Sequence, residues 1–301
     1  MNMQQLKALV AVVETGSIRA AARSLHLSQS AVTKGMRLLE EDAGVPLLVR
    51  GSRGVVLTHA GQRLLARARL VTRQVSLARE ELRQIAGDDG GNLHVGLNPF
   101  VTLTILGEAY RWFRQRYRNV QIEFIEGLMS RVLPRLRDGT LDMAMVAADV
   151  GDLQGDEFHI EHLQRIRQRV VVRKGHPVLQ APTAAALVEY EWIFTRPTAG
   201  DLRPCVSAMF ALAGVAPPAR MVVCEALQAF TLQRNSDAVS LMPEPLLGNP
   251  ETRDIVAIDN TVLQPFDLEL AMLTRPDVPL TPAAEYFAHC ILQTRRSAMK
   301  E

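Results

Sequence analysis

Four polar side chains, Ser30, Thr33, Lys34 and Arg37, recur at helical spacing near the N-terminus of this 301-residue chain. Intervals of three and four place them on one face of a helix. Hydroxyl groups can donate to or accept from base edges, and the lysine and the arginine can reach guanine or a phosphate. A solvated face on a small helical bundle has the same composition. This face alone therefore leaves DNA recognition and an ordinary protein surface as alternatives.

Three predicted helices carry and support this face. Apolar side chains recur at helical intervals in three successive groups: Leu6, Leu9, Val10 and Val13; Ile18, Ala21, Ala22 and Leu25; Val32, Met36 and Leu39. Gly16 and Gly44 are natural stops for the first and third helices, and Ser17 and Ser28 are natural N-caps for the second and third. Two short helices joined tightly to a third are typical of a helix-turn-helix, whose third helix enters the major groove.

A β-hairpin is predicted directly after these helices. Two β-prone runs within residues 46–58 flank the turn Gly51-Ser52-Arg53-Gly54. Arg50 and Arg53 make this hairpin a basic wing, which favours the DNA-binding interpretation. The residues expected to contact DNA are Ser17, Arg19, Ser28, Gln29, Ser30, Thr33, Lys34, Arg37, Arg50 and Arg53.

The N-terminal sequence strongly resembles the LysR family of bacterial transcription regulators. The matching motifs are residues 16–22, 27–33, 39–40, 44–50 and 57–61. Ser30 stands where the family usually has proline, and Gly35 interrupts the recognition helix at a cost of about 1 kcal/mol relative to alanine. The resemblance implies a winged helix-turn-helix in residues 1–58 that binds an operator in double-stranded DNA.

Charge is distributed unevenly along the chain. Residues 1–87 contain 13 Lys and Arg against 6 Asp and Glu, a charge of +7, while the remainder contains 21 against 26, a charge of −5. A basic N-terminal unit fits a polyanionic partner such as DNA. The 48% hydrophobic and 22% charged composition is that of a globular protein, and we expect a cytoplasmic location without a membrane partner. Three cysteines, Cys205, Cys224 and Cys290, are expected to be free structural thiols.

Residues 59–87 predict a long linker helix capped by Thr58. An apolar stripe with alternating steps of four and three contains Leu64, Ala68, Val71, Val75, Ala78, Leu82 and Ile85. A period of 3.5 residues favours pairing of two such helices in a homodimer, although an amphipathic helix packed on its own domain is the alternative. The family resemblance further implies a tetramer built as a dimer of dimers, and RNA polymerase is a further candidate partner.

Residues 91–301 alternate between predicted strands and helices, which indicates an α/β fold. Predicted helices include 104–118, and a return strand is expected at 266–274 before a terminal helix around 281–294. The motifs 136–144, 175–177 and 241–243 resemble the LysR effector domain. That resemblance implies two periplasmic-binding-protein-like lobes, residues 91–162 with 267–301 and residues 163–266, with a ligand between them.

Short polar residues follow several predicted strands of this region. Ligands in such sheets lie beyond strand C-termini, where helix N-termini offer amide groups to anions, and Arg196 could pair with a carboxylate or a sulfonate. We therefore expect a small organic effector, possibly an anion, and no cofactor; ordinary turns are the alternative. The candidate ligand contacts are Asn98, Pro99, Phe100, Thr102, Met129, Ser130, Thr195, Arg196 and Thr198.

No sequence motif points to catalysis. His176 precedes a proline and lacks a neighbouring nucleophile or acid–base pair, and His159 and His162 form only a diffuse group, so neither a catalytic residue nor a metal site is assigned. The leading hypothesis is a ligand-responsive regulator. A cytoplasmic enzyme fused to a DNA-binding domain and a solute-binding protein are the alternatives.

Overall fold

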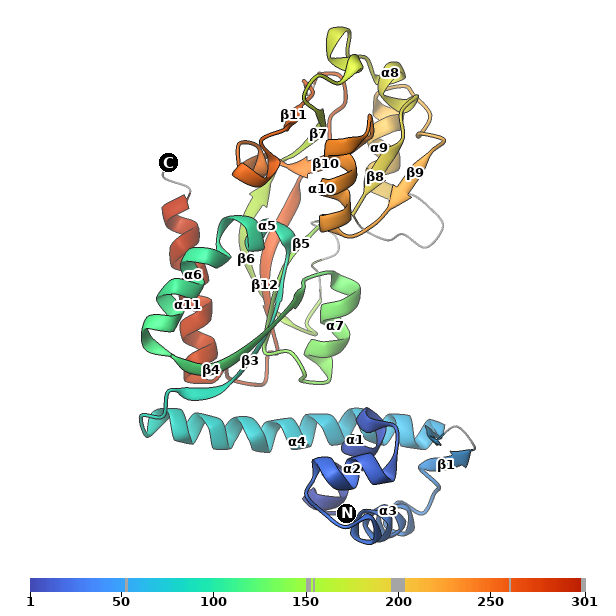
Figure 1. The fold of residues 1–301 in the computed structure, drawn as a ribbon, viewed down its shortest axis with the longest axis vertical. Coiled ribbons are helices and arrows are strands. Elements are labelled where there is room, and N and C mark those ends of the chain that lie inside the picture. The colour runs from blue at the N-terminus through green and yellow to red at the C-terminus, as the bar shows by residue number, and fades with distance from the viewer. Residues whose placement is uncertain (52–53, 150–152, 154, 196–203, 260, 299–301) are drawn as a thin grey trace.

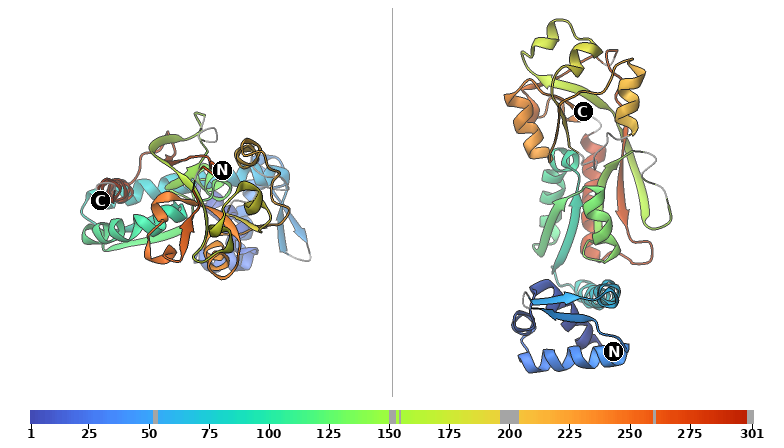
Figure 2. Two further views of the ribbon diagram at one scale, coloured as in Figure 1. Left: turned by 90° about the horizontal axis from the view of Figure 1, so that it is seen from above. Right: turned by 90° about the vertical axis from the view of Figure 1, so that its right-hand side faces the viewer.

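The computed structural model describes residues 1–301 apart from 52–53, 150–152, 154, 196–203, 260 and 299–301. Three parts follow one another along the long axis of the molecule: a small N-terminal domain, a long helix, and two α/β lobes (Figure 1). A second view shows the long helix end-on between the N-terminal domain and the first lobe (Figure 2).

The N-terminal domain consists of three helices and a hairpin: α1 (Met3–Thr15), α2 (Ile18–Ser24), α3 (Gln29–Ala43), β1 (Leu48–Gly51) and β2 (Gly54–Leu57). The predicted caps are present, because the hydroxyl oxygens of Ser17 and Ser28 accept hydrogen bonds from the backbone N–H groups of Ala20 and Ala31. β1 and β2 pair antiparallel. A core containing the inward residues of all three helices holds the domain together.

The long helix α4 (His59–Ile85) begins at Thr58, whose hydroxyl oxygen accepts a hydrogen bond from the N–H of Gly61. A Cβ on Gly61 would lie 2.1 Å from the carbonyl oxygen of Leu47, so glycine permits the close approach of α4 to the chain before β1. Leu65 and Ala68 are buried in the core of the N-terminal domain. The first part of α4 therefore belongs structurally to that domain.

Lobe I is a five-stranded sheet in the order β4-β3-β5-β12-β6. Its elements are β3 (Gly90–Leu97), α5 (Pro99–Thr104), α6 (Leu106–Arg116), β4 (Asn119–Glu126), α7 (Met129–Arg137), β5 (Met143–Ala148), β6 (His159–Ile166), β12 (Leu268–Thr274) and α11 (Pro282–Ala298). β3 runs parallel to β4 and β5, whereas β12 runs antiparallel to β5 and β6. Helices α6 and α11 share one apolar core with the sheet, and α7 packs in another.

Lobe II is a second five-stranded sheet in the order β11-β7-β10-β8-β9. Its elements are β7 (Gln168–Arg173), a 3₁₀ turn (Pro177–Gln180), α8 (Ala184–Val188), β8 (Trp192–Phe194), α9 (Pro204–Leu212), β9 (Met221–Val223), α10 (Ala226–Asn235), β10 (Val239–Pro243), 3₁₀ turns at Glu244–Leu246 and Pro250–Thr252, and β11 (Ile255–Ala257). Trp192 and Phe210 anchor its main core, and α10 covers a separate cluster around Ile193.

Three details differ from the sequence prediction. The expected division after residue 162 falls inside β6, so lobe I continues to Ile166 and the chain crosses at Arg167. The helix expected at 104–118 is α6, and a separate short helix, α5, precedes it because Asn98 caps a helix that begins at Pro99. The return strand begins at Leu268 rather than at residue 266.

Candidate DNA-contact surface and interlobe cavity

The outward face of α3 gathers five of the predicted DNA contacts. Gln29, Ser30, Thr33, Lys34 and Arg37 line one shallow depression in the surface. All except Thr33 are exposed, and Thr33 is half-buried. The guanidinium of Arg37 lies 3.3 Å from the carboxylate of Glu41, one helical turn away. The structure therefore brings hydroxyl, amide and cationic groups together at a surface that a base-pair edge could approach.

The other predicted contacts lie around this face. Ser28 caps α3, and its hydroxyl oxygen is 2.9 Å from that of Ser30. Ser17 caps α2, while Arg19 is exposed on the same helix. Arg53 and the side chain of Arg50 lie outside the described part of the chain. The hairpin that carries them is present as β1 and β2.

Glu40 is a positioning residue that the contact prediction did not include. Its Oε1 accepts hydrogen bonds from the backbone N–H groups of Leu47 and Leu48, at 2.8 and 3.0 Å. These bonds tie the C-terminal half of α3 to the start of β1. Glu40 thus fixes the hairpin relative to the recognition helix, and its place in the 39–40 family motif was the available signal.

The predicted apolar stripe of α4 divides into two parts. Ala68 is buried and Leu64 packs beside it, both within the core of their own N-terminal domain. Farther along, Val71 and Ala78 are exposed, Val75 is half-buried, and Leu82 and Ile85 are 68% and 69% exposed in the single chain. The packing alternative thus describes Leu64 and Ala68, and dimerisation through the remaining five residues stays a prediction.

Polar side chains of α4 bind lobe I directly. A guanidinium nitrogen of Arg73 lies 2.7 Å from Oδ1 of Asp142, and the guanidinium of Arg69 is 3.5 Å from Asp138. Two turns after Arg73, the buried carboxylate of Glu80 accepts a hydrogen bond from the N–H of Asn92 at 2.7 Å. We call this set of contacts the α4–lobe I interface.

Gln84 completes the α4–lobe I interface. Its side-chain oxygen accepts from the N–H of Ala283 at 3.0 Å, and its amide nitrogen donates to the carbonyl of Gly90 at 3.0 Å. Gln84 thus joins α4 to both β3 and α11. Sequence reasoning missed these contacts because a buried glutamine in a charged helix resembles a surface residue.

Asp142 is a buried charged group of the α4–lobe I interface. Burial by itself would raise its pKa. Hydrogen bonding with the side chain of His94, the charge of Arg73 and the backbone N–H of His94 outweigh burial and hold the pKa of Asp142 below its ordinary value. The ionised carboxylate is therefore the form that the folded structure stabilises.

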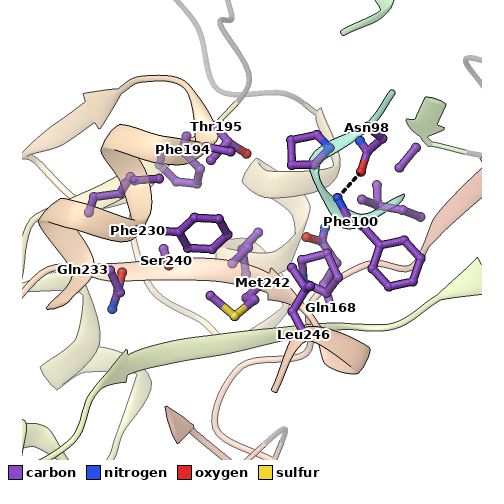
Figure 3. Close-up of a pocket in the computed structure, with 18 of the residues that line it drawn as sticks. Asn98, Phe100, Gln168, Phe194, Thr195, Phe230, Gln233, Ser240, Met242 and Leu246 are labelled. Carbon is purple, nitrogen blue, oxygen red and sulfur yellow. Dashed lines mark hydrogen bonds between the residues drawn. The ribbon is translucent and has the colours of Figure 1, made fainter. Parts of the chain in front are cut away.

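A cavity of about 120 Å³ lies between the two lobes (Figure 3). It is formed where β3, β4 and β8 end, beside α10, β10 and both crossover segments. Its lining residues are Asn98, Pro99, Phe100, Glu126, Leu128, Ala147, Gln168, Ile193, Phe194, Thr195, Val206, Ala226, Ala229, Phe230, Gln233, Ser240, Leu241, Met242, Pro243, Leu246, Phe266 and Leu268.

Only some of the predicted ligand-contact residues line this cavity. Asn98, Pro99, Phe100 and Thr195 line it. Thr102, Met129 and Ser130 are not among its lining residues, and contact of these three with a ligand stays a prediction. Thr102 is exposed and donates to the carbonyl of Asn98, Met129 packs beside the α7 core, and Ser130 is exposed. Arg196 and Thr198 lie outside the described residues.

The shape of the local backbone explains why these three residues do not line the cavity. Asn98 caps α5 by accepting a hydrogen bond from the N–H of Phe100, and the helix then turns Thr102 away. At the second loop, Leu128 rather than the following two residues reaches the cavity, because α7 has already begun at Met129. The cavity thus lies at the strand ends, and the local backbone decides which side chain of each loop lines it.

Polar residues from lobe II were missing from the sequence prediction. Gln233 of α10 and Ser240 of β10 are 1% and 6% exposed, and both line the cavity with Gln168, the first residue of β7. Figure 3 shows Gln233 and Ser240 beside Phe230. The only available signal was a lone serine inside the apolar strand 239–243 and a glutamine on a half-apolar helix.

Glu126 is the only titratable group among the described residues that line the cavity, which include no lysine, arginine or histidine. Burial and then the charge of Glu225 raise the pKa of Glu126, opposed by the backbone N–H of Ala226 and the charge of Arg131. Arg131 lies 3.7 Å from Glu126 and also pairs with Glu225 of lobe II. These groups link the lobes at the rim.

The histidines and cysteines considered in the sequence analysis do not line this cavity. His162 is 2.7 Å from the carboxylate of Glu269 on the neighbouring strand, and within the described residues no group of three potential ligands could hold a metal ion. Cys205, Cys224 and Cys290 are free thiols. In the described part of the chain, no helix is both long and apolar enough to cross a membrane.

Comparisons with known proteins match both parts of the chain. Residues 3–62 match the family of bacterial regulatory helix-turn-helix proteins of the LysR type, and residues 86–296 match the LysR substrate binding domain. The HTH-type transcriptional regulator PcaQ of Agrobacterium fabrum is 29% identical over 290 residues, which cover 93% of this chain and 92% of the relative.

Two further matches agree with that assignment. The Hca operon transcriptional activator HcaR of Escherichia coli is 30% identical over 246 residues, covering 81% of this chain and 82% of the relative. The solved structure of full-length CbnR complexed with its target DNA has a TM-score of 0.65 at 23% identity, covering 98% of this chain and 100% of that chain. The substrate-binding family alone spans more than half of the sequence, and the chain belongs to the LysR family of transcriptional regulators.

Proposed function

We propose that the chain binds operator DNA through α3 and the β1–β2 wing, and that a small molecule in the interlobe cavity changes operator binding. The observation that carries the proposal is the grouping of Gln29, Ser30, Thr33, Lys34 and Arg37 in one surface depression on the third helix of a helix-turn-helix. Such a helix enters the major groove, where these side-chain types read base edges. Operator binding places the protein with the chromosome in the cytoplasm.

The cavity supports the effector part of the proposal. Its volume of about 120 Å³ is of the same order as a cavity of roughly 150 Å³ that accommodates benzene. Apolar walls with a few convergent polar groups are typical of small-molecule sites. The residues come from both lobes, so a bound molecule contacts both and favours one lobe arrangement over another.

The α4–lobe I interface supplies the connection between the two sites. Because α4 starts in the core of the N-terminal domain and ends against lobe I, a change in lobe arrangement moves the recognition helices relative to each other in a dimer. Coupling of this kind is reciprocal: operator DNA changes effector affinity by the same factor by which the effector changes operator affinity. We further propose a homodimer on two half-sites, assembled into a tetramer.

Selection of duplexes from a random library by the full-length protein tests the DNA-binding proposal. We expect an interrupted, A·T-rich palindrome. Thr33→Ala and Arg37→Ala should each reduce the preference for the selected operator over random DNA by about 1–3 kcal/mol, because base contacts carry specificity. Arg53→Ala should weaken binding to both DNAs.

Arg253→Ala is the matched control, since Arg253 is an exposed, loosely paired arginine on lobe II. It should leave both affinities unchanged. Equal losses on operator and random DNA for Thr33→Ala, Arg37→Ala and Arg53→Ala would refute the role given to α3.

A further inference from the structure

Gln233 is a glutamine on α10 that is buried almost completely, with 1% of its surface exposed. Its amide nitrogen donates to two backbone carbonyls, those of Val171 at 3.2 Å and Ala238 at 2.8 Å. Both hydrogens of the amide are thereby used. The two carbonyls also fix the orientation of the amide, because an oxygen in the nitrogen's place would face two acceptors.

The side-chain oxygen of Gln233 accepts no hydrogen bond from the described residues, although it is buried. A buried acceptor without a donor is uncommon and costs about 1–3 kcal/mol. Gln233 is also part of the cavity lining, where it lies beside Ser240 (Figure 3). The unpaired oxygen therefore belongs to a side chain of the cavity lining, where a bound molecule that reaches it can supply the missing donor.

The remaining lining defines what kind of molecule suits that acceptor. Ile193, Phe194, Phe230 and Met242 offer apolar surface around it. Glu126 is the one titratable group among the described lining residues, which contain no cation. Against these described residues, an anion would lose hydration without gaining an ion pair, whereas a neutral hydrogen-bond donor loses little.

We propose that Gln233 selects a neutral effector with an apolar body about one ring in size and a hydroxyl or N–H group that donates to the Gln233 oxygen. This inference rests on the proposed role of the cavity as the effector site. It replaces the anionic effector expected from strand-end residues with a neutral donor. Selectivity arises because an analogue without the donor leaves the buried oxygen unpaired.

Phenol, toluene and benzoate are suitable probes, because they share a ring and differ in one substituent. Calorimetric titration of the full-length protein should show phenol binding at least about tenfold more tightly than toluene, with benzoate weakest. In Gln233→Met, which keeps the side-chain length and removes the acceptor, the phenol-to-toluene preference should fall to about one. Toluene affinity should stay within about threefold, which shows that the cavity is intact.

Gln164→Met is the matched control. Gln164 of β6 also has a buried side-chain oxygen that accepts from none of the described residues, but it is not part of the cavity lining. This variant should retain the full preference for phenol. If replacing any buried glutamine lowered the preference for phenol, both variants would lose it. If Gln233 recognises the donor group, only Gln233→Met loses the preference.

Each contrary result has a distinct meaning. Equal binding of phenol and toluene to the wild-type protein, or a preference that survives Gln233→Met, overturns the role of Gln233. Tightest binding of benzoate, or binding of none of the three probes, overturns the neutral-donor class. None of these results touches operator recognition, and a separate titration of the selected duplex with and without probe shows whether the cavity controls it.

Discussion

Single residues in this protein act mainly through what surrounds them. Asp142 and Glu126 are both carboxylates of lobe I, yet their pKa values are displaced in opposite directions. Asp142 gains hydrogen bonds from His94 and a cationic partner, Arg73, from α4, whereas burial and then the charge of Glu225 across the lobe boundary act against the ionised form of Glu126. A carboxylate therefore stabilises an interface in the first place and carries an unfavourable charge in the second.

Asp142→Asn should lower the stability of the protein by about 3 kcal/mol at pH 7, because it leaves Arg73 without its buried partner. The pKa of Asp142 is depressed in the folded state, so its stabilisation is fully present above the ordinary aspartate pKa, about 4, and is lost as the pH falls through the folded value. Melting temperatures measured across this range should show the variant and wild type converging in acid.

Asp254→Asn provides the control for that measurement. Asp254 is about half-exposed and sits 3.9 Å from Arg253 on the surface of lobe II. Its loss should change the melting temperature little at any pH. A constant difference between Asp142→Asn and wild type down to pH 2 would show that the carboxylate charge is not the stabilising feature.

Gly35→Ala should stabilise the N-terminal domain by about 1 kcal/mol, because alanine has the higher helix propensity and no atom lies within 4 Å of the new Cβ. An added Cβ at Gly16 would also meet no atom within 4 Å, but Gly16 has a φ of +73°. Gly16→Ala should therefore destabilise the N-terminal domain by about 1–2 kcal/mol. Chemical denaturation of both variants checks the opposite signs. Stabilisation by both would mean that backbone conformation is not the deciding factor.

At the scale of elements, local signals predicted the helix starts well. Ser17, Ser28 and Thr58 cap α2, α3 and α4 as expected, because a cap needs only neighbouring residues. The strand β6 was missed because it lies at a sheet edge, where charged and polar side chains such as His159 and Arg165 are exposed. Its pattern is the same as that of a solvated loop.

Leu82→Glu should weaken dimerisation of α4 at least about tenfold and weaken operator binding with it. Leu82 is 68% exposed in the single chain, so a charge there is tolerated by the monomer but not by an apolar seam between two helices. Sedimentation and operator titration measure the two effects. Leu212→Glu, at an even more exposed leucine on lobe II, is the control. A native oligomer with full operator affinity in Leu82→Glu would count against the seam.

At the scale of the whole molecule, the part of the chain proposed to bind DNA and the part proposed to bind the effector differ in net charge. Residues 1–87 carry a charge of +7 and the remainder −5. The cavity residues were harder to predict than this charge asymmetry, because Gln233 and Ser240 of lobe II line the same cavity as Asn98 of lobe I only in the folded protein. The charge of a binding partner can be predicted from amino-acid composition, whereas the residues that line a cavity are set by the tertiary structure.

Salt should therefore affect the two binding events differently. Operator affinity should fall steeply with salt, with a logarithmic slope of about −0.9 for each phosphate contacted. Binding of phenol in the cavity should change less than about twofold between 50 and 300 mM salt, because a neutral probe forms no ion pair. Calorimetry at several salt concentrations measures both. A steep salt dependence for phenol would indicate charged recognition in the cavity.

Lobe II leaves and re-enters lobe I at neighbouring positions, because Ile166 of β6 and Leu268 of β12 are paired across two adjacent strands. Residues 167–267 are thus one continuous segment of the chain whose two ends lie side by side in the folded protein, and one continuous stretch of coding sequence encodes it. Recombination of that stretch between related genes replaces one wall of the cavity, including Gln233, while α3, α4 and the α4–lobe I interface are inherited unchanged. The same regulatory site in a genome can in this way acquire a new chemical signal in a single genetic event.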